Sequence, residues 1–290
     1  MIKNIFFILT LITLFSFDLR KFNSSDHIVY LQKVNEIDSI YRLKNDTLGA
    51  IKLYQELFKK YPPHNSYLIN EYQTYIMLSE KYHRNFGGKE SLYKLIPLVA
   101  PNWKYNRMDK DFFKLYNRYG IDSIEVETEV KTWKKSLNKR LIDSFAIAIK
   151  RDQEKQRSDR NLLIKNDKKN EKLLTWTFTN YGYPSLNKIG VMADNDLVLS
   201  IGTILIHMAS SEKYPYFRDE IMKYVKNGEC PPQEYAEMID KHGLVHNEEF
   251  YGTFINVPIK DSAFVNKNRK QIGMPSLKHS KKIHDEYFKR

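Results

Sequence analysis

Apolar residues recur at helical spacing through the first half of the chain. Residues 47–61 place apolar side chains at steps of three and four, which predicts an amphipathic helix. Asn45 or Asp46 can cap its start, because a side-chain oxygen there accepts an unpaired backbone N–H, and Pro62 follows its end. Similar patterns predict helices over 67–82, 91–99 and 109–119. We therefore expect residues 24–137 to form a module of helical hairpins.

The two predicted hairpins resemble a tetratricopeptide-like array. Their ends, Tyr61-Pro62 and Ala100-Pro101, are 39 residues apart, whereas that repeat spans about 34 residues and needs about three copies. Its signature Trp, Leu, Gly and Tyr positions are also missing. We therefore expect an irregular helical module that leans on its neighbour. Its many tyrosines are typical of core or groove packing, and a concave face that binds a peptide stays open.

The second half begins with an apolar helix that ends in polar residues. Apolar positions continue from Leu141 to Ile149 and are followed by Asp152, Gln153 and Arg157. If the helix continues, Gln153 and Arg157 share a face and Asp152 lies one step to the side. This pattern fits an ordinary charged helix end or one wall of a polar site.

The apolar pattern over residues 195–211 is the strongest indication of a site in the chain. It predicts an almost wholly apolar, buried helix capped by Asp194 or Asn195. Its polar residues fall at steps of three, four and four and so form one stripe. Buried polar groups need hydrogen-bonding partners, so the stripe faces either such partners or a wet pocket. Alternatively, the histidine is a satisfied core residue and the hydroxyls bond their own helix. The stripe consists of Ser200, Thr203, His207 and Ser211.

The last part of the chain predicts two helices and a short strand. Residues 232–242 read as a helix, and Asp240 in its last turn opposes the helix dipole, which indicates a specific partner. Residues 250–255 read as a strand with a glycine inside it. Asp261 can cap a final helix. We expect a mostly α fold, with residues 138–290 forming an α-rich domain that has a short β-hairpin or strand near Tyr251-Gly252-Thr253.

The amino terminus predicts a targeting segment. Lys3 precedes an uncharged 13-residue run, Ile5 to Phe17. A spanning helix needs about 20 residues, so this run favours a signal peptide or a short membrane anchor over residues 1–20. Ser16 or Ser24 would make a weak cleavage site, and a buried amino-terminal helix of a cytosolic protein is the alternative. Export to an oxidising compartment fits a chain whose single cysteine, Cys230, cannot pair internally.

The positive charge does not indicate nucleic-acid binding. The chain has 47 basic and 35 acidic residues, a net charge of +12, and only 12 of the basic residues are arginine. Dedicated phosphate and base contacts favour the planar fork of arginine. The densest basic stretch, 150–172, is interleaved with acids and reads as a solvated face. We expect no nucleic-acid partner.

An ordered set of residues in the second half resembles the bacterial domain-of-unknown-function family numbered 6624. The resemblance covers residues 138–290 and implies an exported protein in which the domain follows helical repeats; it implies no reaction. Two positions depart from the family: Lys241 stands where an arginine is usual, and Phe254 where a glutamine is usual. The set comprises Asp152-Gln153-x-x-x-Arg157, Gly182-x-Pro184, His207, Asp240, Tyr251-Gly252-Thr253, Pro258-Ile259-x-Asp261, Arg269 and Gly273.

These residues suggest one polar pocket. His207 with Asp152 or Asp240 would pair a base with the carboxylate that orients it, so these three are the candidate catalytic residues. Two arginines in the set suggest an anionic ligand. The candidate binding residues are Gln153, Arg157, Tyr251, Thr253 and Arg269.

Neither a metal nor a cofactor is expected at this pocket. A single histidine with scattered carboxylates lacks the spacing of metal ligands, and no glycine-rich phosphate-binding motif is present. Three functions stay open: a small exported hydrolase acting on an anionic substrate, a non-catalytic domain that binds a small anionic molecule or peptide, and a structural or interaction module. Membrane contact would come only through the amino-terminal segment.

Overall fold

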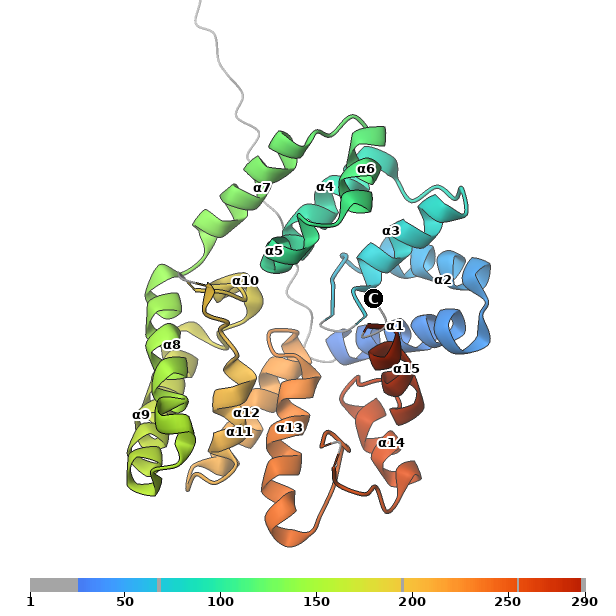
Figure 1. Cartoon of the computed structure of the whole chain (residues 1–290). Helices are drawn as coiled ribbons and strands as arrows, with labels where there is room; N and C mark the ends of the chain where they lie inside the picture. The colour runs from blue at the N-terminus through green and yellow to red at the C-terminus, as the bar shows by residue number, and fades with distance from the viewer. Residues whose placement is uncertain (1–25, 67–68, 194–195, 255, 288–290) are drawn as a thin grey trace, which may run out of the picture.

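The computed structural model describes residues 26–66, 69–193, 196–254 and 256–287, and within these ranges the protein is built of helices (Figure 1). The described part contains no β-strand, only an isolated antiparallel bridge between Met192 and Val198. None of its helices is long and apolar enough to cross a membrane. The predicted targeting segment, residues 1–20, lies outside the described residues.

The described helices follow one another along the chain. The first half contains α1 (Asp26–Lys44), α2 (Thr47–Lys60), α3 (Glu71–Lys81), α4 (Gly88–Val99), α5 (Trp103–Asn106), α6 (Lys110–Arg118) and α7 (Ser123–Ser136). The second half contains α8 (Lys139–Asp152), α9 (Arg160–Tyr181), α10 (Leu186–Ile189), α11 (Ile201–Met208), α12 (Tyr214–Asn227), α13 (Pro232–Gly243), α14 (Ser262–Gln271) and α15 (Leu277–Tyr287). Short 3-10 turns, η1 (Ala100–Asn102), η2 (Glu154–Arg157) and η4 (Leu244–His246), extend α4, α8 and α13.

Side-chain caps explain where several helices begin. The carboxylate of Asp46 accepts the backbone N–H of Gly49 at 2.8 Å, which confirms the expected start of α2. Asp261 likewise accepts the N–H groups of Ala263 and Phe264, both at 2.9 Å, at the start of α14. Each cap satisfies backbone donors that the first turn of a helix leaves unpaired. The same device begins α6, α7, α8 and α9, at Asp109, Asp122, Asn138 and Asp159.

The buried apolar side chains form two clusters. The first runs from Tyr30 to Val130 and also includes Ile283 of α15. The second runs from Leu141 to Met274. The expected boundary near residue 137 falls between the two clusters along the chain, and the division into independent domains stays a prediction. Ile283 shows that the last helix packs with the first module.

Helix α1 is the element to which the end of the chain returns (Figure 1). It packs against α2, α12 and α15. Its Gln32 and Asn35 side chains donate to the carbonyls of Lys270 and Gly273, each at 2.8 Å. Gly273 has a φ of +80°, and a Cβ there would lie 2.8 Å from that of Leu31, so a larger residue would push α1 away. The two modules therefore meet at α1 as well as at the α7–α8 connection.

Two sequence expectations were wrong in this region of the fold. Residues 250–254 are a loop and not a strand, because the side chain of Asp240 takes up the backbone donors that a strand would use. The apolar segment 195–211 is helical only over Ile201–Met208. Before it, Ala193 and Leu199 donate across a turn to Leu197 and Val191. The expected caps Asp194 and Asn195 lie outside the described residues.

Candidate functional site

The carboxylate of Asp152 lies at the end of α8 and is fully buried. Arg157 donates from Nη1 to Asp152 Oδ1 at 2.8 Å and to the Asp152 carbonyl at 3.1 Å. The α-helix ends before Arg157, because Lys155, Gln156 and Arg157 all have left-handed φ values of 50–60°. The two residues therefore meet through a tight turn and not through the helical spacing expected from the sequence.

Arg157 is shared between two carboxylates. Asp167 on α9 accepts from Nη1 at 3.1 Å and from Nη2 at 2.8 Å, which is a bidentate pair. The side chain of Arg157 keeps 17% of its surface exposed, so the guanidinium borders solvent. With Asp152 on one side and Asp167 on the other, the positive charge of Arg157 is compensated within the protein.

His207 on α11 completes this group. Its Nε2 lies 3.4 Å from Asp152 Oδ2, and its side chain is 21% exposed. Gln153 donates from Nε2 to the same carboxylate oxygen at 2.6 Å. Burial alone would raise the pKa of Asp152, but His207, Arg157 and Gln153 outweigh it and lower this pKa below its usual range. Asp152 is therefore an ionised carboxylate that lies against a mostly buried imidazole.

Helix α9 supplies polar residues that the sequence analysis assigned to a solvated face. Asn166 donates to the carbonyl of Arg151 at 2.9 Å and to Glu154 at 3.0 Å. Glu171 accepts from the hydroxyl of Ser211 at 2.6 Å. Both α9 side chains are buried. The spacing of Asn166, Asn170, Leu174 and Phe178 at steps of four is the signal that this face is buried.

The polar stripe of α11 divides among different partners. The hydroxyls of Ser200 and Thr203 lie 2.7 Å apart at the start of the helix, where Ser200 is exposed. His207 contacts Asp152 on α8, and Ser211 contacts Glu171 on α9. Because α8, α9 and α11 all pack on one another, the stripe joins three helices. We call Asp152, Gln153, Arg157, Asp167 and His207 the His207 set.

Asp240 lies in a second, closed network. Its Oδ1 accepts the backbone N–H groups of Phe250 and Tyr251, and its Oδ2 accepts that of Thr253, all at 2.9 Å. The Thr253 hydroxyl also donates to Oδ2, at 2.8 Å. Only 1% of Asp240 is exposed. The partner indicated by its place at the end of α13 is thus the loop that follows.

Arg269 holds the other side of the same loop. It donates from Nη1 to the carbonyl of Tyr251 at 2.7 Å, from Nε to that of Pro275 at 2.6 Å, and from Nη2 to the Ser280 hydroxyl. Burial lowers the pKa of Arg269 to about 10, and the nearby charge of Asp240 opposes this shift. We call Asp240, Tyr251, Thr253 and Arg269 the Asp240 set.

The eight residues proposed from the sequence thus fall into two sets. Asp152, Gln153, Arg157 and His207 make direct contacts with one another at the ends of α8 and α11. The remaining four are bonded around the loop between α13 and α14. Among the described residues, no hydrogen bond or ion pair joins the two sets. The His207 set borders solvent, whereas the Asp240 set is built to hold a loop.

The residues that could supply covalent or metal chemistry are limited. Cys230 is buried, and burial raises the pKa of its thiol well above the usual range, which disfavours the nucleophilic thiolate. Its neighbour Glu234 is contacted by the Tyr183 hydroxyl, and burial raises the pKa of Glu234 to about 7. In the part of the chain that the structure describes, no three histidine, cysteine or acidic residues are placed to hold a metal.

Comparison with known proteins identifies no relative, because no family model, no curated protein and no solved structure matches this chain.

Proposed function

We propose that the second half of the chain is a small hydrolase in which His207 is the general base and Asp152 orients it. The observation that carries this proposal is the contact of 3.4 Å between an imidazole that is one-fifth exposed and a fully buried carboxylate. A base that contacts an acid through one nitrogen and has no protein partner at the other is an arrangement suited to proton transfer.

Water is the nucleophile that fits these residues. Nε2 of His207 faces Asp152, and its Nδ1 has no hydrogen-bond partner among the described residues. Nδ1 takes a proton from water as the oxygen attacks the substrate's acyl or phosphoryl centre, and the imidazolium then returns that proton to the leaving group. Asp152 stays ionised through this cycle, because its pKa is held low, and stabilises the imidazolium.

An anionic substrate would use the donors that the protein leaves free. The bonds of Arg157 to Asp152 and Asp167 use Nη1 and one hydrogen of Nη2, which leaves its Nε–H and the second Nη2 hydrogen for a substrate oxygen. Lys213, just after α11, lies 3.6 Å from Glu171 and is about half exposed. Arg269 is fully engaged in its own loop, so it is not part of this substrate site.

A structural role for the His207 set is the second candidate, and the double pairing of Arg157 favours it. Two carboxylates compensate one guanidinium, and such a network can hold the ends of α8, α9 and α11 together without any ligand. A non-catalytic binding site for a small anionic molecule or peptide would use the same open atoms as the hydrolase. The three roles differ in what replacement of His207 changes.

The test is a comparison of His207→Gln with His246→Gln, an exposed histidine away from the set. Both full-length variants are assayed against nitrophenyl esters and phosphates, and their thermal unfolding is recorded. A hydrolase loses at least about a hundredfold in kcat when its general base is removed, with Tm close to that of the control. Loss of stability without any activity in the parent protein would support the structural role. If the parent binds these compounds without turning them over and His207→Gln changes that affinity, the result would support a non-catalytic binding site.

The proposal also covers the family of the second half and the location of the protein. We propose that residues 138–290 are a member of the domain-of-unknown-function family numbered 6624 and that the protein is exported from a bacterial cell through its amino-terminal segment. The ordered residues in the second half and the apolar run from Ile5 to Phe17 support them. Fractionation of a tagged protein tests export: soluble cytoplasmic protein with an intact Met1 would contradict it.

A further inference from the structure

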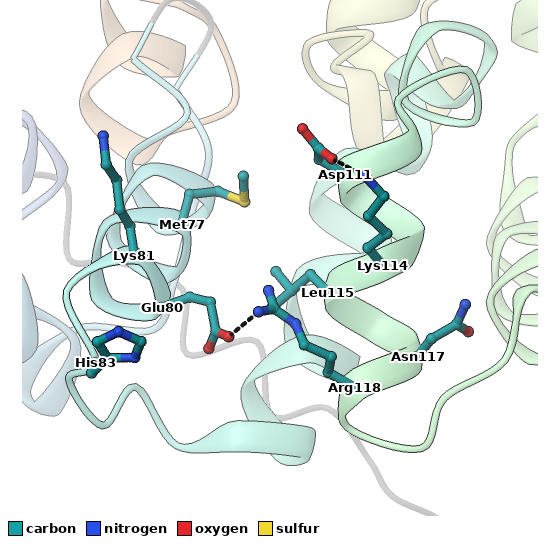
Figure 2. A pocket seen from close by; sticks show the side chains of 9 residues that line it. All are labelled: Met77, Glu80, Lys81, His83, Asp111, Lys114, Leu115, Asn117 and Arg118. Atoms are coloured by element: carbon teal, nitrogen blue, oxygen red, sulfur yellow. Dashed lines mark hydrogen bonds and ion pairs between the residues drawn. The ribbon is translucent and has the colours of Figure 1, made fainter.

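A depression of about 700 Å³ lies between the end of α3 and helix α6, in the first module and far along the chain from the His207 set (Figure 2). On α6, Asp111, Lys114, Leu115 and Arg118 recur at steps of three, one and three, so they share one helical face. Met77, Glu80 and Lys81 form the opposite wall, with His83 just beyond the end of α3.

The floor of the depression is apolar and its rim is charged. Leu115 is 2% exposed, whereas Met77 keeps 39% of its surface open to solvent. Figure 2 shows Glu80 and Arg118 reaching toward one another across the lower end, and their ion pair measures 3.0 Å. The two helices are therefore joined at one end of the depression and separate at the other.

Positive charge is in excess at the open end. Asp111 and Lys114 form a pair of 2.9 Å in which both side chains are more than 70% exposed. Such exposed pairs contribute little to stability, so a competing carboxylate can share Lys114. Lys81 makes no ion pair among the described residues, and it is exposed on the opposite wall. The Tyr119 hydroxyl and Arg118 hold Glu80 to the side, at 2.8 and 3.0 Å.

The chemistry of the lining favours a segment of another protein over a small molecule. Small-molecule sites enclose their ligand, whereas this depression is open to solvent, and Met77 and Leu115 lie in it beside charged, amide and imidazole side chains. A nucleic acid is disfavoured because its phosphates recur at every nucleotide and would face Glu80 and Asp111 as well as the lysines, whereas a peptide can place its carboxylates opposite Lys81 and Lys114 alone. An apolar floor between walls that each carry an exposed lysine fits a peptide that carries an apolar side chain between carboxylates.

We propose that this depression binds an acidic segment of a partner protein. An apolar side chain of the segment lies on Met77 and Leu115, and carboxylates on its two sides pair with Lys81 of one wall and Lys114 of the other. The site is independent of the His207 set and adds an interaction surface to the first module.

The experiment measures binding of short fluorescent peptides to the full chain by fluorescence anisotropy near physiological salt. The probe has glutamates on both sides of two leucines. One comparison peptide replaces the leucines by serines, and another replaces the glutamates by lysines. We expect the first to bind best, because only it satisfies both the floor and the walls. Equal binding of the serine peptide would overturn the proposal, since general attraction of the glutamates to a basic protein would then account for the binding of both peptides.

Charge-reversal variants locate the site. The double variant Lys81→Glu, Lys114→Glu should bind the probe at least about tenfold more weakly than the parent. Lys165→Glu with Lys169→Glu makes the same change in net charge on exposed positions of α9 and should leave affinity within about twofold. All four lysines are exposed, so the fold should survive, and matching circular dichroism melts verify this. An equal loss in both double variants, or tighter binding of a single-stranded DNA than of the peptide, would refute the proposed site.

Discussion

His279 of α15 and Asp38 of α1 form a buried pair that joins the last helix of the chain to the first. Their Nε2 and Oδ2 atoms lie 2.7 Å apart, and both side chains are almost completely buried. Arg42 donates from Nε to the same oxygen of Asp38 at 2.8 Å. A buried carboxylate needs such hydrogen-bonding partners, so α15 is tied to α1 by this polar contact as well as by the packing of Ile283.

Replacing His279 by alanine should therefore destabilise the full chain by about 2–3 kcal/mol. The loss stays below that of a fully broken buried pair, because Arg42 still compensates Asp38. Denaturant unfolding measures the change, and Lys278→Ala, an exposed neighbour on the same helix, is the control. If the two variants unfold at the same denaturant concentration, the buried pair does not hold α15.

A fragment covering residues 138–290 should fold but leave α15 exposed. The second apolar cluster is complete within the fragment, whereas Ile283 and His279 lose their partners on α1. Amide hydrogen exchange should then be fast in Leu277–Tyr287 and slow in α11 and α13. Full protection of the last helix in the fragment, or the lack of a cooperative melt, would contradict this division of the chain.

Local patterns predicted the helices whose apolar face is continuous within one segment. The helix expected over 47–61 forms over Thr47–Lys60 with the expected Asp46 cap, and that expected over 232–242 forms over Pro232–Gly243. Helix α9 was missed, because its buried face carries Asn166 and Glu171, which bind groups on other helices. The spacing of apolar residues along the chain cannot by itself show that a polar face of a helix is buried.

Contacts between distant residues explain the other differences. Aromatic and β-branched residues at 250–254 favour a strand, but the carboxylate of Asp240 captures three backbone N–H groups there and forms a loop. The sequence did not distinguish Asp152 from Asp240 as the partner of His207, because the order of residues along the chain does not give the distances between them. In the structure His207 lies against Asp152, and Arg157 reaches that carboxylate through a left-handed turn that helical spacing does not predict.

Acidification should destabilise the first module through His27. Burial, and then the charge of His64, lowers the pKa of His27 to about 4, from an ordinary value of about 6.5. The unfolded chain therefore binds more protons, so this contribution to stability is complete above pH 6.5 and is lost as the pH falls toward 4. Between pH 7 and 5 the loss should be about 2 kcal/mol.

Other groups oppose this trend, so the test compares two proteins. Glu234, whose pKa is raised to about 7, favours the folded state as the pH falls, and burial also raises the pKa of Glu71, which accepts from the Tyr30 hydroxyl. Denaturant unfolding of the parent and of His27→Gln at pH 7 and 5 removes these shared contributions. The parent should lose about 2 kcal/mol more than the variant over this range, and equal losses would show that His27 does not titrate as its burial requires.

Asp240→Asn should release the loop between α13 and α14. An asparagine keeps one acceptor oxygen but turns an NH₂ group toward the N–H and hydroxyl of Thr253, so donors would face donors. The change also removes the charge that favours ionised Arg269. We expect a loss of about 3 kcal/mol in the free energy of unfolding and faster cleavage by chymotrypsin at Phe250 and Tyr251.

The matched control is Asp261→Asn, because asparagine caps a helix as well as aspartate does, and it should change stability by only a few tenths of a kcal/mol. If Asp240→Asn is as stable and as resistant as this control, the carboxylate does not organise the loop, and Asp240 would return to consideration as part of the reactive site.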